Sequence, residues 1–344
     1  MMQHLNTLFV TLEGAWLFKD GQAVEVRHDG QTNLRVPLHN LDGIVCLGWD
    51  IGATVQLMAA CAEAGVTLSF CSPHGKFLAA ATGFASGNVL LRRTQYRLAD
   101  DDAACAGIAR QIVAAKISNS RVSLLRAARD HPDEPAAAQF GSAAQWLGHR
   151  IDAVMRESSL DIIRGIEGDS AAAYFDCMPS LLTTNDPTLR MNGRSRRPPL
   201  DPVNALLSFL YALLNHDCRS ALAACGLDPA VGFLHRDRPG RASLALDLME
   251  EFRPVLADRL ALSLLNRKQL DGADFNRQEN GAVALREASR KKVLVAWQER
   301  KREELIHPFL QEKVPWGIVP HLQARLLARH LRGDLDAYPA FLWK

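Results

Sequence analysis

Residues 231–254 read VGFLHRDRPGRASLALDLMEEFRP, a polar turn that changes into an apolar segment. The turn contains His235 and is rich in Arg, Asp, Pro and Gly. In the apolar segment, hydrophobic side chains recur at helical spacing, at Leu244, Leu248, Phe252 and Val255. This period predicts a helix over residues 244–266 that packs its apolar face inward.

Three acids interrupt the apolar segment: Asp247, Glu250 and Glu251. Glu250 and Glu251 follow Asp247 by three and four residues, so all three are neighbours on one surface of the predicted helix. A Pro-Gly turn at residues 239–240 precedes the helix, which lets His235 fold back over its first turns. The like charges of these carboxylates repel each other among apolar neighbours. A bound cation would remove the free-energy cost of this repulsion.

Overall composition limits the class of protein but not its activity. With 344 residues and 48% hydrophobic content, the chain can form one or two domains with buried cores. The formal net charge is only +2, so any nucleic-acid surface must be a local patch. Seven cysteines without a CxxC pair are typical of free thiols in a reducing compartment. Neither a signal peptide nor a membrane-length apolar run is found, which predicts a soluble, cytoplasmic protein without a membrane partner.

The hydrophobic period divides the chain into two parts. The first hundred residues contain short runs typical of strands, a hairpin signal at Asp20 and Gly21, and one helix over residues 53–64. From residue 88 the period becomes helical, and helices are expected over residues 103–128, 202–225, 281–305 and 320–331. The predicted class is α+β: a small N-terminal β-sheet domain (1–86), a linker (87–102) and a larger all-α C-terminal catalytic domain (103–344).

Glu167 is a further acid, at the start of an expected helix of small residues in RGIEGDSAAAYF (164–175). With His235 and Asp247 or Glu250 it would supply one nitrogen and several carboxylate oxygens, which suit Mg²⁺ or Mn²⁺ better than structural zinc. The alternative is ordinary structure, because Glu167 alone is typical of an N-terminal dipole partner and a single histidine before a helix is commonly a cap. Composition and spacing leave both alternatives open. No P-loop, GxGxxG or GxSxG motif supports a kinase, a dinucleotide-binding protein or a serine hydrolase.

Basic residues cluster locally along the chain. Arg92 and Arg93 lie at the predicted domain junction, and Arg325, Arg329 and Arg332 follow at helical spacing close to Gln323. Such a stripe suits a phosphate backbone, although a solvated face with ion pairs is the commoner arrangement. The other clusters are Arg194, Arg196 and Arg197; Arg290, Lys291 and Lys292; and Arg300, Lys301 and Arg302.

Several segments together resemble one known family. They are GNVLLRRTQY (87–96), AKISNSR (115–121), RGIEGDSAAAYF, RSRRPPLDPVNALLSFLYALL (194–214), the stretch 231–254 and VAWQERKREELIHPFL (295–310). In this order, and along nearly its whole length, the chain closely resembles the CRISPR adaptation integrases, the first of the two universal Cas proteins. GNVLLRRTQY and the ending AYPAFLWK resemble the subtype I-C branch of that family.

The resemblance implies a metal-dependent DNA endonuclease and integrase. Its N-terminal β domain would mediate homodimerisation, and its C-terminal α domain would carry the active site. The implied metal ligands are Glu167, His235 and Glu250, with Asp247 as the accompanying acid. The long turn HRDRPGRAS leaves open which of Asp247, Glu250 and Glu251 reaches the metal, and Arg238 falls where some members place a basic residue near DNA.

In the implied reaction, the 3′-hydroxyl of a captured double-stranded DNA fragment attacks a phosphodiester at the edge of a CRISPR repeat. Bound Mg²⁺ or Mn²⁺ would activate that hydroxyl and offset charge at phosphorus. The small second adaptation protein (Cas-two) would bridge dimers of this chain into a larger complex. Two other functions fit the same residues: a structure-selective nuclease acting on branched DNA in repair, and a DNA-binding scaffold without catalysis.

Overall fold

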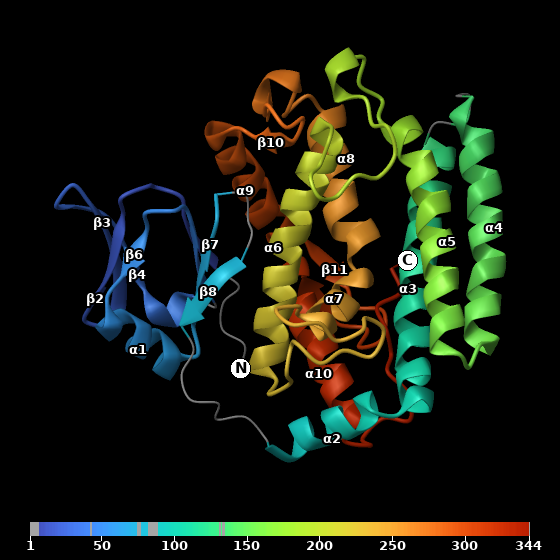
Figure 1. Ribbon diagram of the computed structural model, residues 1–344, viewed down its shortest axis with the longest axis horizontal. Helices are drawn as coiled ribbons and strands as arrows, with labels where there is room; N and C mark the ends of the chain where they lie inside the picture. Colours follow the sequence, from blue (N-terminus) through green and yellow to red (C-terminus); the bar gives the residue numbers. More distant parts are fainter. Residues whose placement is uncertain are drawn as a thin grey trace. The chain divides into compact units, whose positions relative to one another are not determined.

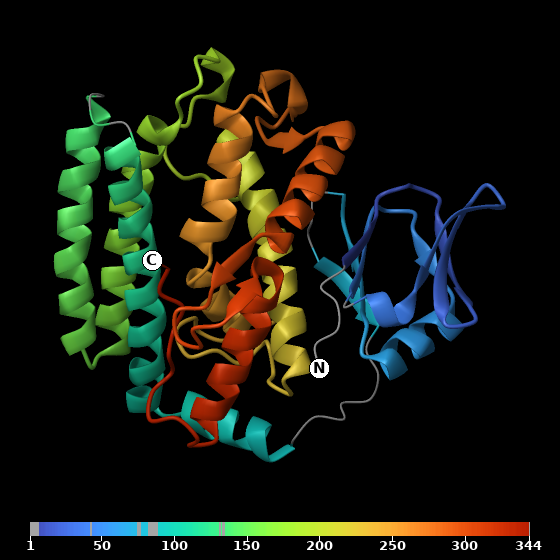
Figure 2. The same ribbon diagram turned by 180° about the vertical axis from the view of Figure 1, so that it is seen from behind.

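The computed structural model describes residues 7–41, 43–73, 77–81, 89–130, 132 and 135–343. The chain forms two compact units. The first contains Met1–Gly87, Glu287–Glu303 and Pro315–Ile318, and the second contains Asn88–Arg286, Glu304–Val314 and Val319–Lys344. The predicted class is confirmed, because a region of β-sheet precedes a mostly helical part of the chain (Figures 1 and 2).

The first unit contains two four-stranded sheets. One has the order β1-β5-β7-β8, in which β1, β5 and β7 are parallel and β8 is antiparallel to β7. The other has the order β4-β3-β2-β6, and the predicted hairpin at Asp20 and Gly21 is confirmed because it joins β2 to β3. The strands are β1 (Thr7–Val10), β2 (Trp16–Asp20), β3 (Ala23–His28), β4 (Gln31–Pro37), β5 (Gly43–Leu47), β6 (Gly52–Ala53), β7 (Thr67–Cys71) and β8 (Phe77–Ala81).

A hydrophobic cluster holds these strands against helix α1 (Val55–Ala64). Leu17, Ile44 and Leu68 from the strands and Leu57 from the helix are all fully buried in it. The Thr54 side chain caps α1 by accepting a hydrogen bond from Leu57 N. Strand β5 is buried along its whole length, so the strands and α1 share one core.

Helix α9 (Glu287–Arg302) belongs to the first unit, although it lies some two hundred residues further along the chain. Val293, Leu294 and Trp297 are its buried apolar face, and Gln298 donates a hydrogen bond to Thr7 O at 3.3 Å. The prediction that residues 281–305 form one helix of the all-α domain was wrong at its start. Residues 283–285 instead form strand β10, because Gly281 turns the chain with a φ of +81°.

The second unit is built around helices. Figures 1 and 2 both show α3, α4 and α5 side by side, and α6 is the predicted apolar helix, opened by Pro202 and capped by Asp201. The helices are α2 (Val89–Ala99), α3 (Asp102–Asp130), α4 (Ala136–Arg156), α5 (Leu160–Cys177), α6 (Pro202–Ala224), α7 (Ser243–Glu250), α8 (Arg259–Asn266) and α10 (Val319–Leu331). Short helical turns of this unit are η2 (Met178–Leu181), η3 (Pro187–Leu189) and η5 (Gly272–Asp274), whereas η1 (Leu38–Asn40) and η6 (Trp316–Ile318) belong to the first unit.

Three further expectations differ from the structure. The expected linker 87–102 contains helix α2, which packs on α3. The expected helix 244–266 is interrupted after Glu250 and continues as a π-helical segment, η4 (Arg253–Asp258), because Pro254 has no N–H for an α-helical hydrogen bond. The part expected to be all-α also holds strands β9 (Phe275–Arg277), β10 (Val283–Leu285), β11 (Glu304–Ile306) and β12 (Lys313–Pro315).

A membrane-spanning helix would have to be long and continuously apolar. Among the residues that the structure describes, none of the helices meets both conditions.

Candidate functional site

Four segments of the second unit bring the candidate side chains together. Helix α3 supplies Lys116, helix α5 supplies Glu167, the loop before α7 supplies His235, and the last turn of α7 supplies Glu250. Glu167 lies seven residues after the first residue of α5, which Ser159 caps. The alternative that Glu167 is an N-terminal dipole partner was therefore wrong, since that effect is confined to the first turn.

Lys116 links the two glutamates. Its Nζ atom forms an ion pair with Glu167 Oε1 and lies 2.6 Å from Glu250 Oε2. The Glu250 side chain is 3% exposed and that of Lys116 10%, whereas Glu167 is 26% exposed. The two carboxylates thus converge on one buried ammonium group, with Glu167 on the side that solvent reaches.

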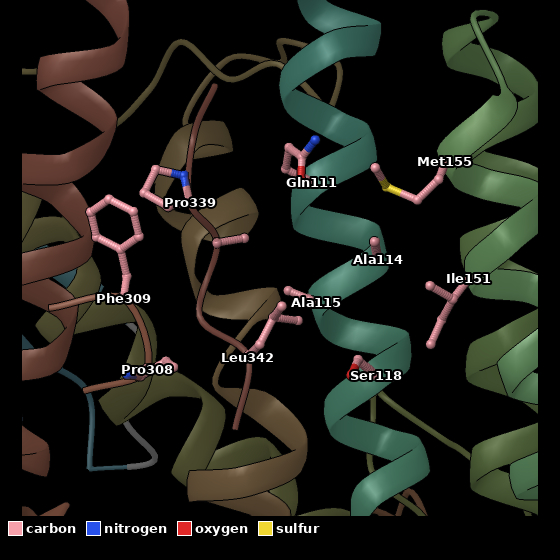
Figure 3. A pocket seen from close by; sticks show the side chains of 11 residues that line it. Gln111, Ala114, Ala115, Ser118, Ile151, Met155, Pro308, Phe309, Pro339 and Leu342 are labelled. Carbon is pink, nitrogen blue, oxygen red and sulfur yellow. The ribbon is translucent and has the colours of Figure 1, made fainter. Parts of the chain in front are cut away.

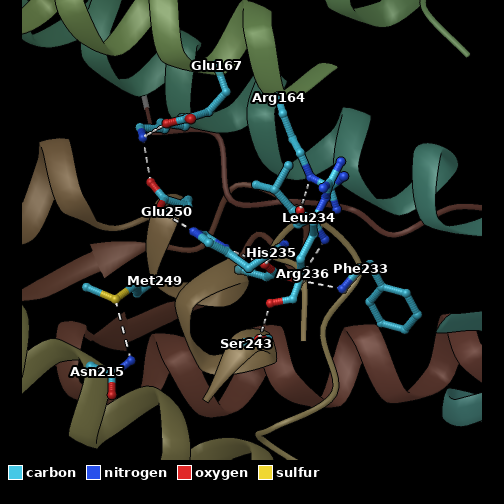
Figure 4. A network of polar contacts seen from close by, with 12 residues as sticks. Arg164, Glu167, Asn215, Phe233, Leu234, His235, Arg236, Ser243, Met249 and Glu250 are labelled. Atoms are coloured by element: carbon cyan, nitrogen blue, oxygen red, sulfur yellow. Dashed lines mark hydrogen bonds and ion pairs between the residues drawn. The ribbon is translucent and has the colours of Figure 1, made fainter. Parts of the chain in front are cut away.

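His235, on the loop before α7, lies beside Glu250 (Figure 4). Its Nε2 atom lies 3.9 Å from Glu250 Oε1, and its Nδ1 atom lies 2.7 Å from Asp247 Oδ1. An ionised carboxylate can only accept hydrogen bonds, so Nδ1 is assigned the ring hydrogen. Nε2 is then the nitrogen presented to Glu250.

Asp247 is completely buried and organises the loop that carries His235. Its Oδ2 accepts hydrogen bonds from Phe233 N (2.6 Å) and Leu234 N (3.0 Å), and its Oδ1 accepts from His235 N (2.9 Å). Gly232 makes this approach possible, because a Cβ atom there would lie 2.8 Å from Asp247 Oδ2. Asp247 therefore positions His235 and has no oxygen directed at Glu167.

Charged neighbours keep Glu250 ionised. Burial alone would raise the pKa of Glu250, but Arg253, whose Nη2 lies 3.2 Å from Oε1, and Lys116 lower this pKa to about 2. Burial alone would lower the pKa of Lys116, and the Glu250 and Glu167 carboxylates raise it above its ordinary value. The site thus holds permanent charges of both signs in a buried setting.

Glu251 points away from this cluster, toward the C-terminal segment. Tyr338 Oη donates a hydrogen bond to Glu251 Oε1 (2.6 Å), and Phe341 N and Gln323 Nε2 donate to Oε2 (2.7 and 3.0 Å). Asn119 Nδ2 donates to both Glu251 O and Phe341 O. Of the three acids left open by the sequence, only Glu250 faces Glu167.

Glu251→Gln is expected to change how stability depends on pH. Burial raises the pKa of Glu251 from 4.5 to about 7, although the hydrogen bonds from Tyr338, Phe341 and Gln323 oppose this. Between these values the folded chain holds a proton that the unfolded chain has released, so wild-type stability falls as pH rises. Relative to wild type, the variant should therefore gain about 3 kcal/mol between pH 4.5 and pH 8.

Urea denaturation of both proteins across this range measures the difference, with the exposed Glu279→Gln as the matched loss of one carboxylate. A stability difference between Glu251→Gln and wild type that stays constant with pH would contradict a raised pKa for Glu251.

The donor set fits a hard divalent cation. Two carboxylates and one imidazole nitrogen converge, and such ligands suit Mg²⁺ or Mn²⁺. As the side chains stand, no three His, Cys, Asp or Glu residues in the described ranges are arranged to hold a metal ion. Adjacent ligands of one such ion lie about 3 Å apart in octahedral geometry and opposite ligands about 4.2 Å apart, and the 3.9 Å from His235 Nε2 to Glu250 Oε1 lies between these values. The donors are thus suitable but spread around Lys116.

Two cavities flank the site. One, of about 520 Å³, is polar and is lined by His235, Arg164, Arg236, Asp161 and Ser159 among others. The other, of about 550 Å³, is lined only by uncharged residues from α3, α4, the loop between β11 and β12 and the C-terminal segment, including Ala115 and Phe309 (Figure 3). His235 forms part of the wall of the polar cavity only.

The structure divides the predicted basic residues into two groups. Arg194 is half-buried, is packed between the rings of Phe175 and Tyr211 and donates to Asn204 Oδ1 (2.6 Å), so it is a weaker candidate for a DNA-binding surface than the exposed arginines. Lys301 and Gln323 are buried, which removes them from the predicted clusters. Those that stay exposed are Arg93, Arg196, Arg197, Arg238, Lys291, Lys292, Arg302, Arg325, Arg329 and Arg332.

Three more predicted basic residues have partners within their own unit. Arg92 is half-buried, and its Nε donates to Gly226 O at 3.1 Å. Arg290 donates to Pro73 O, and Arg300 pairs with Glu303. These contacts are structural, so Arg92 and Arg290 are weaker candidates for DNA binding than the exposed arginines.

The sequence patterns did not identify three polar residues at or near the site: Lys116, Asn119 and Arg253. Lys116 and Asn119 both lie in AKISNSR, three residues apart on one helix surface, within an otherwise small and apolar segment of α3. A lysine and an asparagine on a face that must be buried need polar partners, and this signal could have identified them. Arg253 gave no comparable signal, since it adjoins Pro254 in a segment expected to continue as a helix.

Comparison with known proteins gives a consistent result. The family model described as "CRISPR associated protein Cas1" matches residues 8–299. The chain is 50% identical over 344 residues to "CRISPR-associated endonuclease Cas1 1" of Chlorobaculum tepidum, and the match covers 100% of both chains.

Solved structures show the same fold. A casposase bound to integration product has a TM-score of 0.84 at 22% identity and covers 98% of this chain and 94% of its own. The protein of a Cas6-RT-Cas1–Cas2 complex has a TM-score of 0.81 at 23% identity, over 98% of this chain and 36% of that one. Because the family model covers most of the sequence and the first relative matches it end to end, this chain belongs to the CRISPR-associated Cas1 family.

Proposed function

We propose that this chain is a metal-dependent DNA endonuclease and integrase that inserts captured DNA fragments into a CRISPR array. The observation that carries the proposal is the convergence of Glu167, His235 and Glu250 in a member of the Cas1 family. Its full-length relative is named an endonuclease, and one structural neighbour is bound to an integration product.

The proposed reaction is a transesterification. The 3′-oxygen of the captured fragment forms a new bond to phosphorus at the repeat edge, and the bond from that phosphorus to the repeat's own 3′-oxygen breaks. The displaced oxygen leaves as a 3′-hydroxyl after taking up a proton, so no oxidant or further reactant is needed. A side-chain nucleophile is not required either.

Glu167, His235 and Glu250 would hold one Mg²⁺ or Mn²⁺. When bound, such an ion lowers the pKa of a coordinated hydroxyl and offsets negative charge at phosphorus. The chain's own residues prepare this site: Asp247 fixes the His235 ring so that Nε2 faces Glu250, and Arg253 keeps Glu250 ionised. The polar cavity beside His235 would admit the DNA strand.

Partners and assembly follow from the family. We propose that the N-terminal β domain forms a homodimer, and that the small second adaptation protein, Cas2, bridges such dimers on double-stranded DNA. One structural neighbour comes from a complex that contains Cas2. The exposed arginines would bind phosphates without reading sequence, so DNA binding should weaken steeply with added salt. The amino-acid sequence of residues 87–96 favours subtype I-C.

The test is strand transfer of a short labelled duplex into a repeat-containing plasmid, with Cas2 supplied. We expect joining with Mn²⁺ or Mg²⁺, none with EDTA, and none with His235→Ala. His149→Ala, which removes an exposed histidine from α4, should join as wild type does. Cutting of branched DNA without joining would instead favour the repair nuclease, and binding without any chemistry would favour the scaffold.

A further inference from the structure

One lysine bridges two of the three predicted metal ligands. Lys116 Nζ contacts one oxygen of Glu167 and, at 2.6 Å, one oxygen of Glu250. Ammonium–carboxylate contacts are typically about 2.7–2.9 Å, only somewhat longer than the roughly 2.1 Å from Mg²⁺ to a carboxylate oxygen. A divalent ion bound to the same two oxygens would therefore need nearly the space that Nζ fills.

We propose that Lys116 is an internal counter-cation, which occupies the metal position in the metal-free protein and leaves it when the metal binds. This inference rests on the proposed function, because it assumes that Glu167 and Glu250 are ligands. It deepens that function by naming a residue that competes with the metal.

The surroundings show why such a cation is present. Glu250 is almost fully buried, and two buried carboxylates without a counter-charge would be strongly unfavourable. Arg253 forms its ion pair in this cluster with Glu250, whereas Lys116 forms ion pairs with both Glu167 and Glu250. A lysine suits this task because its compact charge sits on a long flexible stem and can withdraw without backbone movement.

Competition with Lys116 makes a quantitative prediction. A metal that must wait for Lys116 to leave binds with an affinity reduced by the fraction of molecules in which the position is open. If that fraction is about one in ten or less, removing the ammonium should tighten binding by about tenfold or more. The wild-type site would then bind metal weakly in the absence of DNA.

The experiment is a Mn²⁺ titration without DNA, followed by the electron paramagnetic resonance signal of the free ion. Lys116→Gln, which keeps the length but loses the charge, should bind Mn²⁺ about tenfold tighter than wild type, and Lys116→Met should do the same if it folds. Lys116→Arg should bind no more tightly than wild type. The control is Arg121→Gln, which removes one charge from the same helix at a residue that donates to Ala144 O and touches neither glutamate.

A crystal structure with Mn²⁺ gives a second readout. We expect an anomalous peak between Glu167 and Glu250, with Nζ displaced from its present contacts. Equal Mn²⁺ affinity of wild type and Lys116→Gln, or a peak elsewhere with Lys116 still bridging, would overturn the role of Lys116 and leave the integrase proposal standing. An absence of Mn²⁺ binding in every variant would overturn both.

Discussion

Glu167→Ala is expected to reduce strand transfer by roughly 10³-fold or more while leaving duplex binding within about twofold. Glu167 is the most exposed of the three converging residues, and it faces Lys116 and Glu250 across the site. Its loss removes one of two carboxylates that would hold the metal, but it removes none of the exposed arginines that would grip phosphates. This variant should therefore lose strand transfer but keep its affinity for duplex DNA.

The matched control is Asp169→Ala on the same helix. Asp169 is 69% exposed and pairs with Arg150 at 3.2 Å on the surface, a contact of little energetic weight. It should join DNA at the wild-type rate. Joined product is counted on a denaturing gel and binding is measured by fluorescence anisotropy; if Glu167→Ala still joins DNA, the assignment of the site is wrong.

The sequence predicted the neighbourhood of the site but could not rank its acids. Asp247, Glu250 and Glu251 lie within one helical turn, so periodicity places all three on one surface. Their roles are set by partners elsewhere in the chain: the 233–235 loop for Asp247, Lys116 and Arg253 for Glu250, and Tyr338 and Phe341 for Glu251. Such long-range partners leave no local signal.

Long-range packing also limited how much of the fold could be predicted. The change of period near residue 88 separates a β region from a helical region, and the structure has both. Yet α9 has the same amphipathic pattern whichever unit it packs against, so only the structure could group it with the strands. The interruption after Glu250 was readable in advance, because Pro254 cannot donate to an α-helical hydrogen bond.

Asp247→Asn should destabilise the second unit although it is a conservative change. Asp247 accepts four hydrogen bonds, three from backbone N–H groups and one from His235 Nδ1, whereas asparagine offers one accepting oxygen. In either orientation its NH₂ group faces two donors inside a fully buried site. Each unsatisfied buried donor costs about 1–3 kcal/mol, so we expect the two donors to lower stability by roughly 2–6 kcal/mol, measured by urea denaturation.

The same substitution should also impair strand transfer in whatever fraction stays folded. If the introduced side-chain amide donates to His235 Nδ1, the ring hydrogen must move to Nε2, and Nε2 can then no longer act as a metal ligand. Asp152→Asn is the matched control, because Asp152 is an exposed aspartate on α4 that lies outside the polar cavity, and its replacement should leave stability and joining unchanged. Wild-type stability and joining in Asp247→Asn would show that the buried carboxylate neither supports this loop nor sets the orientation of His235.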